Sequence, residues 1–214
     1  MQATIRNIIP LSATVTSFVF EPERPLDYIA GQFADITLPH KADELGITRQ
    51  FTLSSSPTEP HGAFTVRFPD TSSSFKHALK QLKPGDLFHI SGSLGDFVLP
   101  RISSTPLVWI AGGIGITPFR SHAVWLAAAD EHRDITLHHR TSDDTRLWRN
   151  EFNKINLTPH DYTSAKDLQS RLHANPEALY YIAGSPDFTR TIQESLIKKD
   201  VGPDKIVTDA FLGY

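Results

Sequence analysis

A run of glycines follows an apolar segment near the middle of the chain. Leu107 to Ala111 is apolar, and Gly112-Gly113-Ile114-Gly115-Ile116-Thr117-Pro118 follows it directly. Glycine lets a backbone come close to a ligand, Thr117 is a candidate N-cap, and proline suits the first turn of a helix. The amide groups and dipole of a helix that begins here would attract an anion such as a pyrophosphate. We predict a phosphate site on this loop, and a tight structural turn is the alternative.

A second loop of the same kind occurs late in the chain. The apolar segment Leu179 to Ala183 leads into Gly184, Ser185 and Pro186, with the serine placed to cap a helix. Both loops would stand at the carboxyl ends of parallel strands, where open α/β sheets bind ligands. We therefore expect the two loops to line one crevice.

The first half of the chain has candidate contacts for a phosphate and for a flat ring. The segment Arg49 to Ser55 predicts a strand with Arg49 and Phe51 on one face and Gln50 and Thr52 on the other. An arginine can bind a phosphate through two parallel hydrogen bonds, and an aromatic side chain can stack on a ring. The segment alone is weak evidence, because aromatic and hydroxyl residues are common in strands.

The elements that must position these residues differ between the two halves. Up to about Arg101, short apolar runs separated by turn residues predict an all-β sheet or an antiparallel β-barrel, with one capping helix at Ser74 to Leu82. The predicted strands of this half are 13–20, 32–38, 50–53, 63–68 and 87–90. From Thr105 onward strands alternate with helices, which predicts a parallel α/β sheet covered on both faces. The predicted strands here are 107–111, 135–139, 179–183 and 205–208, and the predicted helices are 118–129, 144–155 and 187–199.

Composition excludes several kinds of chemistry. The chain has 214 residues and no cysteine, so disulfides, thiolate zinc sites and cysteine-ligated clusters are excluded. Its 21 basic and 24 acidic residues give no field of one sign that would attract nucleic acid or an anionic membrane. The sequence has neither a long apolar run nor a signal-peptide pattern, and we expect a cytoplasmic protein. The histidines are scattered, and the adjacent His138 and His139 would face opposite sides of a strand, so we predict no metal site.

Taken in chain order, the motifs resemble those of ferredoxin-NADP reductase-like flavoenzymes over essentially the whole chain. Arg49-Gln50-Phe51-Thr52 is similar to the family's Arg-x-aromatic-Ser/Thr flavin motif, and Ser74 falls where a serine holds the flavin pyrophosphate. The run from Ala111 to Pro118 resembles the nicotinamide-nucleotide loop, and Phe211 to Tyr214 resembles the aromatic C terminus. Two departures are Ala183, which stands in place of a frequent cysteine, and a short segment from Asn156 to Leu179.

The resemblance implies a flavin-dependent NAD(P)H oxidoreductase of two domains. An FAD-binding β-barrel would occupy residues 1–101 and a Rossmann-like NAD(P)-binding domain residues 102–214. FAD is the implied cofactor, with FMN as the alternative, and NADPH or NADH the implied hydride donor. Electrons would pass to a separate acceptor, either a ferredoxin- or flavodoxin-type protein or a small molecule. The alternatives are a reductase component of a multicomponent oxygenase or haem system, and a flavin sensor or electron-transfer subunit without turnover.

The resemblance also implies roles for single residues. Thr52, Asp209 and Phe211 are the candidate catalytic residues beside the flavin, although Asp209 could equally be a solvated acid at a strand end. Arg140, after strand 135–139, would hold the 2′-phosphate of NADPH, although Asp143 and Asp144 would repel it and a general adenosine contact is the alternative. The candidate cofactor-binding residues are Arg49, Gln50, Phe51, Thr52, Ser55, Arg67, Ser74, Phe75, Gly112, Gly113, Gly115, Thr117, Pro118, Arg140, Gly184, Ser185, Pro186, Phe211 and Tyr214.

Overall fold

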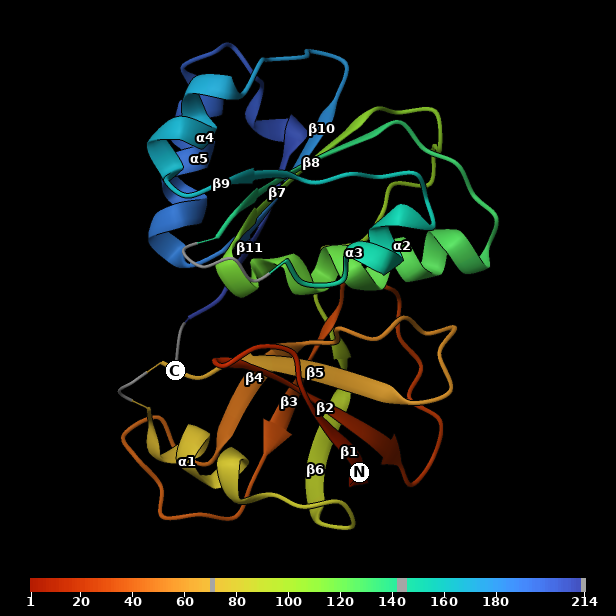
Figure 1. The fold of residues 1–214 in the computed structure, drawn as a ribbon, viewed down its shortest axis with the longest axis vertical. Helices are drawn as coiled ribbons and strands as arrows, with labels where there is room; N and C mark the ends of the chain where they lie inside the picture. Colours follow the sequence, from red (N-terminus) through yellow and green to blue (C-terminus); the bar gives the residue numbers. More distant parts are fainter. Residues whose placement is uncertain (70–71, 142–145, 213–214) are drawn as a thin grey trace. The chain divides into compact units, whose positions relative to one another are not determined.

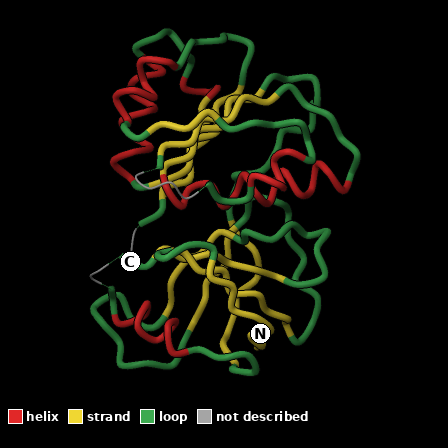
Figure 2. Tube along the Cα trace, in the orientation of Figure 1, coloured by secondary structure: helices red, strands yellow, loops and turns green. Residues whose placement is uncertain are grey.

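The structure is a computed structural model that describes residues 1–69, 72–141 and 146–212 (Figure 1). The chain divides into two compact units between Val98 and Leu99, close to the boundary that the sequence predicts after Arg101. Figure 2 shows that the first unit consists mainly of strands and that strands alternate with helices in the second. Among the described residues, no helix is both long enough and apolar enough to cross a membrane.

The first unit is an antiparallel sheet of six strands. They are β1 (Gln2–Pro10), β2 (Val15–Pro22), β3 (Phe33–Thr37), β4 (Thr48–Thr52), β5 (Gly62–Arg67) and β6 (Leu87–Leu94), in the order β4-β3-β6-β1-β2-β5. A bridge between Leu53 and Phe64 joins the two ends of this order, so that the sheet closes into a barrel. Helix α1 (Ser74–Gln81) buries Phe75 and Leu79 in the barrel core. The predicted barrel with one capping helix is confirmed.

Aromatic side chains fill the barrel. The rings of Phe18 and Phe64 stack with centroids 5.2 Å apart, and Phe20 meets Phe88 edge to face at 5.4 Å. All four side chains are buried. Each such pair stabilises a core by about 0.5–1.5 kcal/mol beyond the area that it buries. Aromatic packing therefore stabilises the barrel that carries β4 and α1.

The second unit is a parallel sheet of five strands with helices on both faces. The strands are β7 (Leu107–Gly112), β8 (Ile135–Arg140), β9 (His160–Tyr162), β10 (Leu179–Gly184) and β11 (Ile206–Ala210), in the order β11-β10-β7-β8-β9. Figure 1 shows α2 (Thr117–Ala128) and α3 (Arg149–Asn153) on one face, and α4 (Ala165–Arg171) and α5 (Pro186–Ile197) on the other. Two 3-10 turns complete the unit, η1 (Gly113–Ile116) and η2 (Pro203–Lys205). The predicted Rossmann-like sheet is confirmed.

The segment between β8 and β10 differs from the sequence prediction. The helix predicted at 144–155 is only α3 (Arg149–Asn153), and Asp144 lies outside the described residues. This helix begins after Trp148, whose positive φ of 55° breaks the helical path. Strand β9 and helix α4 were not predicted. A strand of three residues is too short to show an alternating pattern, and α4 spans two turns behind its cap, Ser164.

Candidate functional site

Arg49 is the best-connected candidate in the first unit. Its side chain lies on β4 and is only 1% exposed. Its Nη1 donates hydrogen bonds to the carbonyl oxygens of Leu45, Gly46 and Thr48 at 3.0, 3.1 and 2.8 Å. Its Nη2 donates to Oδ1 of Asp43 in an ion pair. The loop before β4 therefore fixes the position of the guanidinium group.

Ser74 and Phe75, at the start of α1, meet Arg49 around Asp43. The Ser74 hydroxyl donates to Oδ2 of Asp43 at 2.8 Å, and Cζ of Arg49 lies 5.3 Å from the centre of the Phe75 ring. The hydrogen bond from Arg49, and then the one from Ser74, hold the pKa of Asp43 below its usual value. The structure thus brings together Arg49, Ser74 and Phe75, which the sequence assigns to the cofactor. Because this donor set already holds a carboxylate, its chemistry fits a phosphate anion.

Phe51 packs between two rings at the edge of the same cluster. Its ring centroid is 5.8 Å from that of Phe75 and 5.2 Å from that of Phe64, and its side chain is half-buried. The predicted alternation holds for the buried Arg49 and the exposed Gln50. It ends at Thr52, since the chain there reaches the bridge to β5 and residues 52–56 are all buried.

Two further candidates of the first unit lie on the barrel. The Ser55 hydroxyl accepts a hydrogen bond from the amide of Ala63 at 2.8 Å and lies 2.8 Å from the Tyr28 hydroxyl. Arg67 ends β5, opposite Val15 of β2. Ser55 therefore has a structural role in joining two segments of the barrel, in addition to any contact with a cofactor.

The glycine loop of the second unit has a different start from the predicted one. Gly112 ends β7, and residues 113–116 form the turn η1, which runs directly into α2. Thr117 is the first residue of α2 rather than its N-cap, and Pro118 follows it as the second. The backbone amide of Thr117 donates to the carbonyl of Ile114, and its hydroxyl does so at 3.1 Å. The amides without a helical acceptor are thus those at the start of η1, nearer to the strand than the sequence indicates.

Two of the three glycines are required by contacts within the protein. A Cβ atom on Gly115 would lie 2.1 Å from the carbonyl oxygen of Ala183, and one on Gly112 would lie 2.6 Å from the Phe188 ring. Gly113 has a φ of 56°, which glycine adopts at no cost. From the sequence alone, these glycines are predicted to let the backbone come close to a ligand. The structure shows that they also let the loop after β7 pack against the loop after β10.

The second loop matches its prediction closely. Ser185 caps α5, because its hydroxyl accepts the amide of Phe188, and Pro186 is the first residue of the helix. Gly184 ends β10 immediately before this cap. Both loops lie at the carboxyl ends of neighbouring parallel strands, β7 and β10, as predicted.

The last described strand brings C-terminal candidates to the same edge. Asp209 on β11 pairs with Ala183 on β10, and the amide of Phe211 donates to the carbonyl of Gly184 at 2.7 Å. The Phe211 side chain is half-buried. Tyr214, the other candidate of this segment, lies outside the described residues.

Arg140 extends the edge on the opposite side of the glycine loop. It ends β8, where it pairs with Gly112 of β7 and with Tyr162 of β9. Its Nε is buried and has no hydrogen-bond partner among the residues that the structure describes. Asp143 and Asp144, which the sequence sets against a phosphate here, lie outside the described residues. A buried donor without a partner is costly, and it fits an arginine that receives a ligand.

His139 and Asp161 support the glycine loop and were not predicted as site residues. Nε2 of His139 lies 3.0 Å from the carbonyl oxygen of Gly113, and because a carbonyl only accepts, Nε2 carries the proton. On its other side, Nδ1 is 3.8 Å from Oδ1 of Asp161, which also pairs with Arg149. Only the pairing of β7, β8 and β9 brings these residues together, so no local pattern could reveal them.

His138 points elsewhere, as the predicted alternation requires. Its Nδ1 lies 2.9 Å from the Tyr162 hydroxyl, and its ring stacks on His160 with centroids 5.4 Å apart. Burial first, and then the neighbouring His160 and His173, lower the pKa of His138 from 6.5 to about 4.

This shift leads to a prediction for stability at acid pH. Between about pH 6.5 and pH 4 the unfolded chain binds a proton at His138 that the folded chain does not, so stability falls as the pH falls. The loss approaches about 3 kcal/mol by pH 4. In urea unfolding measured at several pH values, His138→Gln is expected to flatten this decline. His132→Gln, at an exposed position of the same unit, should leave it unchanged. If the free energy of unfolding declined equally with falling pH in the wild type and in both variants, His138 would not be the cause of the decline.

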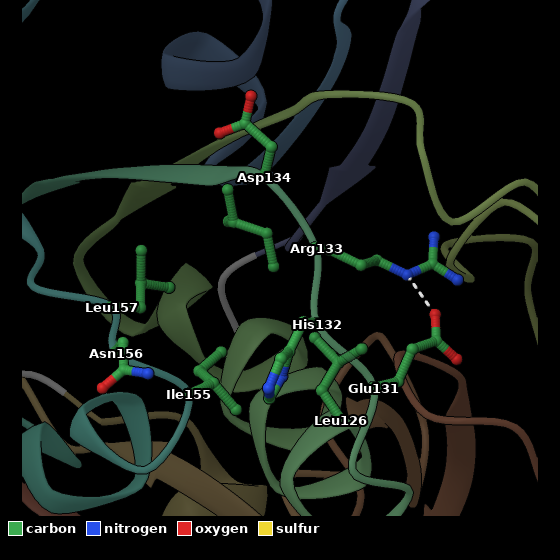
Figure 3. Close-up of a pocket in the computed structure, with 9 residues that line it drawn as sticks. Leu126, Glu131, His132, Arg133, Asp134, Ile155, Asn156 and Leu157 are labelled. Carbon is green, nitrogen blue, oxygen red and sulfur yellow. Dashed lines mark hydrogen bonds and ion pairs between the residues drawn. The ribbon is translucent and has the colours of Figure 1, made fainter.

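A cavity of 380 Å³ in the second unit lies away from these candidates. It stands at the amino end of β8 and is lined by Leu126, Glu131, His132, Arg133, Asp134, Ile135, Ile155, Asn156 and Leu157. Figure 3 shows the Arg133 guanidinium turned toward Glu131, with which it forms an ion pair at 2.5 Å. The cavity contains none of the predicted site residues. The predicted residues of this unit lie instead at the opposite, carboxyl edge of the sheet.

Comparison with known proteins relates the whole chain to flavohemoproteins. It is 29% identical to a flavohemoprotein of Bacillus subtilis in an alignment of 226 positions, gaps included, that covers 94% of this chain and 56% of the relative. A flavohemoprotein of Dictyostelium discoideum is 26% identical, with 94% of this chain and 57% of the relative covered. The chain thus spans little more than half the length of these relatives. No family model matches the chain.

Solved structures share the fold of both units. The FAD/NAD binding domain of nitric oxide dioxygenase from Vibrio cholerae superposes with a TM-score of 0.82 at 21% identity, covering 98% of both chains. Ferredoxin-NADP+ reductase from Plasmodium falciparum gives a TM-score of 0.83 at 19% identity, covering 98% of this chain and 95% of the other. The chain thus has the two-domain fold of ferredoxin-NADP reductase-like flavoenzymes, the family that its motifs resemble.

Proposed function

We propose that the protein is an NAD(P)H-dependent flavin oxidoreductase that transfers electrons to a separate acceptor. The observation that carries this proposal is the arrangement at the carboxyl edge of the second unit. There the parallel register places two glycine loops, Arg140 and Phe211 along four neighbouring strands. Open α/β sheets bind nucleotides at this edge. We assign the first unit to FAD and the second to the nicotinamide nucleotide.

The residues of the first unit would hold and orient FAD. Arg49 and Ser74 would bind its diphosphate, since they already bind a carboxylate between them. Phe51, half-buried between Phe64 and Phe75, would offer its ring to the flavin, and Thr52 would lie beside it. FAD, when bound, accepts a hydride from NAD(P)H and releases electrons one or two at a time.

The residues of the second unit would position the nucleotide. The amides at the start of η1, held in place by the bond from His139 to Gly113, would bind its phosphates. Phe211 would lie at the nicotinamide end, because its amide is tied to Gly184. Asp209, next to Ala183 in the register, would place a carboxylate beside the position where the family resemblance implies a frequent cysteine.

The acceptor is a separate protein or a small molecule. Relatives and neighbours include flavohemoproteins, a cytochrome P450 reductase of Amycolatopsis and the ferredoxin reductase of a carbazole dioxygenase. These names favour a haem protein or an oxygenase component as the second candidate acceptor, beside ferredoxin- or flavodoxin-type proteins. We place the reaction in the cytoplasm, where NAD(P)H is available.

Visible spectroscopy tests the proposal. The purified chain, reconstituted with FAD, is expected to show the flavin absorption band, and anaerobic NADPH or NADH should bleach it. With an artificial acceptor, the nucleotide should then be oxidised continuously. Such turnover distinguishes an enzyme from a flavin sensor that does not turn over. A chain that binds no flavin, or a flavin that neither nucleotide reduces, would refute the proposal.

The choice between NADPH and NADH depends on Arg140. If its guanidinium binds the 2′-phosphate, Arg140→Ala is expected to raise the KM for NADPH roughly tenfold or more, because that substrate alone loses a charged contact. The KM for NADH should change little. Arg101→Ala removes an exposed arginine at the amino end of the same sheet and serves as the control. Equal effects of Arg140→Ala on both nucleotides would instead make Arg140 a general adenosine contact.

A further inference from the structure

Asp43 lies between Arg49 and Ser74 in the first unit, although no motif includes it. Its Oδ1 accepts hydrogen bonds from Nη2 of Arg49 and from the amide of Leu45, and its Oδ2 accepts from the Ser74 hydroxyl. Both carboxylate oxygens are therefore used. The pair that would bind a flavin diphosphate is bridged by a side chain of the protein itself.

Ser74 cannot serve Asp43 and a phosphate at the same time. A serine hydroxyl has one proton to donate, and here it points to Oδ2 of Asp43. A phosphate beside the Asp43 carboxylate would also meet a negative charge at close range, which is unfavourable. For the Ser74 hydroxyl to donate to a diphosphate, the carboxylate has to release it, and charge repulsion favours its release from Arg49 as well.

The segment that carries Asp43 is built as a small surface turn. The amide of Gly46 donates to the carbonyl of Asp43 at 3.0 Å, and Gly46 has a φ of 77°. Glu44 is exposed and Leu45 is 64% exposed, so the outer side of the turn faces solvent. Asp43 itself keeps 28% of its side chain exposed, whereas its partner Arg49 is buried. Rotation of the Asp43 side chain alone would release the carboxylate, while the carbonyl oxygens of Leu45 and Gly46 keep the guanidinium of Arg49 in place.

We propose that Asp43 competes with the flavin diphosphate for Arg49 and Ser74, and that it thereby sets the affinity of the protein for FAD. This inference rests on the proposed function, because it requires FAD to bind at these two residues. Before flavin binds, Asp43 holds the buried guanidinium and the start of α1 together. When flavin binds, the phosphate oxygens replace the carboxylate and Asp43 turns outward.

Titration of the flavin-free full chain with FAD, followed by flavin fluorescence, tests the competition. Asp43→Asn and Asp43→Ala are expected to bind FAD about two- to fivefold more tightly than the wild type, which is the effect of losing a partly exposed ion pair. Glu44→Gln removes the same charge from the neighbouring exposed position and is the matched control, expected to bind like the wild type. Without flavin, thermal unfolding should show the Asp43 variants melting below both the wild type and Glu44→Gln.

The outcomes separate this inference from the function on which it rests. If the wild type binds FAD and the Asp43 variants bind it equally or more weakly, Asp43 is a positioning residue for Arg49 and the competition is refuted. If Glu44→Gln tightens FAD binding as much as Asp43→Asn, the loss of any negative charge on this turn explains the effect, and the specific competition is again refuted. If the wild type binds no FAD, the proposed function fails, and the competition fails with it. Should Asp43→Ala fold poorly, the nearly isosteric Asp43→Asn alone decides the question.

Discussion

Replacing Arg49 with alanine is expected to lower the affinity for FAD by roughly tenfold or more. A charge-assisted hydrogen bond contributes about 1.5–3 kcal/mol, and 1.4 kcal/mol corresponds to a factor of ten. The substitution also removes the donor for three backbone carbonyls and the partner of Asp43, so the first unit should melt at a lower temperature. Fluorescence titration with FAD and quantification of flavin bound after purification measure the first effect, and thermal unfolding measures the second.

Two control variants separate binding from folding in this experiment. Arg49→Lys keeps the charge but loses the planar fork, and it should bind FAD with an affinity between those of the wild type and Arg49→Ala. Arg24→Ala removes an exposed arginine of the same unit and should change neither flavin binding nor stability. Titrations are compared at a temperature at which all variants are folded. Equal FAD affinity in Arg49→Ala and the wild type would place the diphosphate elsewhere.

The barrel illustrates which parts of a site the sequence predicts. Arg49 and Ser74 lie in recognisable positions of a motif and of a helix start, and the structure brings them together around one anion. Asp43 escaped prediction because its contacts with these residues depend on the path of a loop, which no residue pattern encodes. Ser55 illustrates the converse, since its hydroxyl is already engaged by Tyr28 and Ala63 within the barrel.

In the second unit the sequence predicts which loops lie at the carboxyl edge of the sheet, but not which strands and loops are neighbours there. The alternation of strands and helices predicts that loops 112–118 and 184–186 follow the carboxyl ends of strands, and both do. The order β11-β10-β7-β8-β9 is not encoded locally, and it alone brings His139 to Gly113 and Phe188 to Gly112. The same order places Gly115 against the backbone of β10, so its small size has a cause that the loop sequence does not reveal.

Gly115→Ala is accordingly expected to damage the second unit. The added Cβ would lie 2.1 Å from the carbonyl oxygen of Ala183 and 2.7 Å from the amide nitrogen of Gly184. Both are backbone atoms of β10, so relief requires the loop after β7 to separate from the loop after β10. Overpacking of this kind costs about 1–3 kcal/mol of stability, and the separated loops should raise the KM for the nucleotide roughly tenfold. Gly92→Ala, where a Cβ meets nothing within 4 Å, is the matched control and should change neither quantity. Thermal unfolding and kinetics with an artificial acceptor measure both effects. If Gly115→Ala behaved like Gly92→Ala, the close packing of the two loops would not be what holds the nucleotide site in shape.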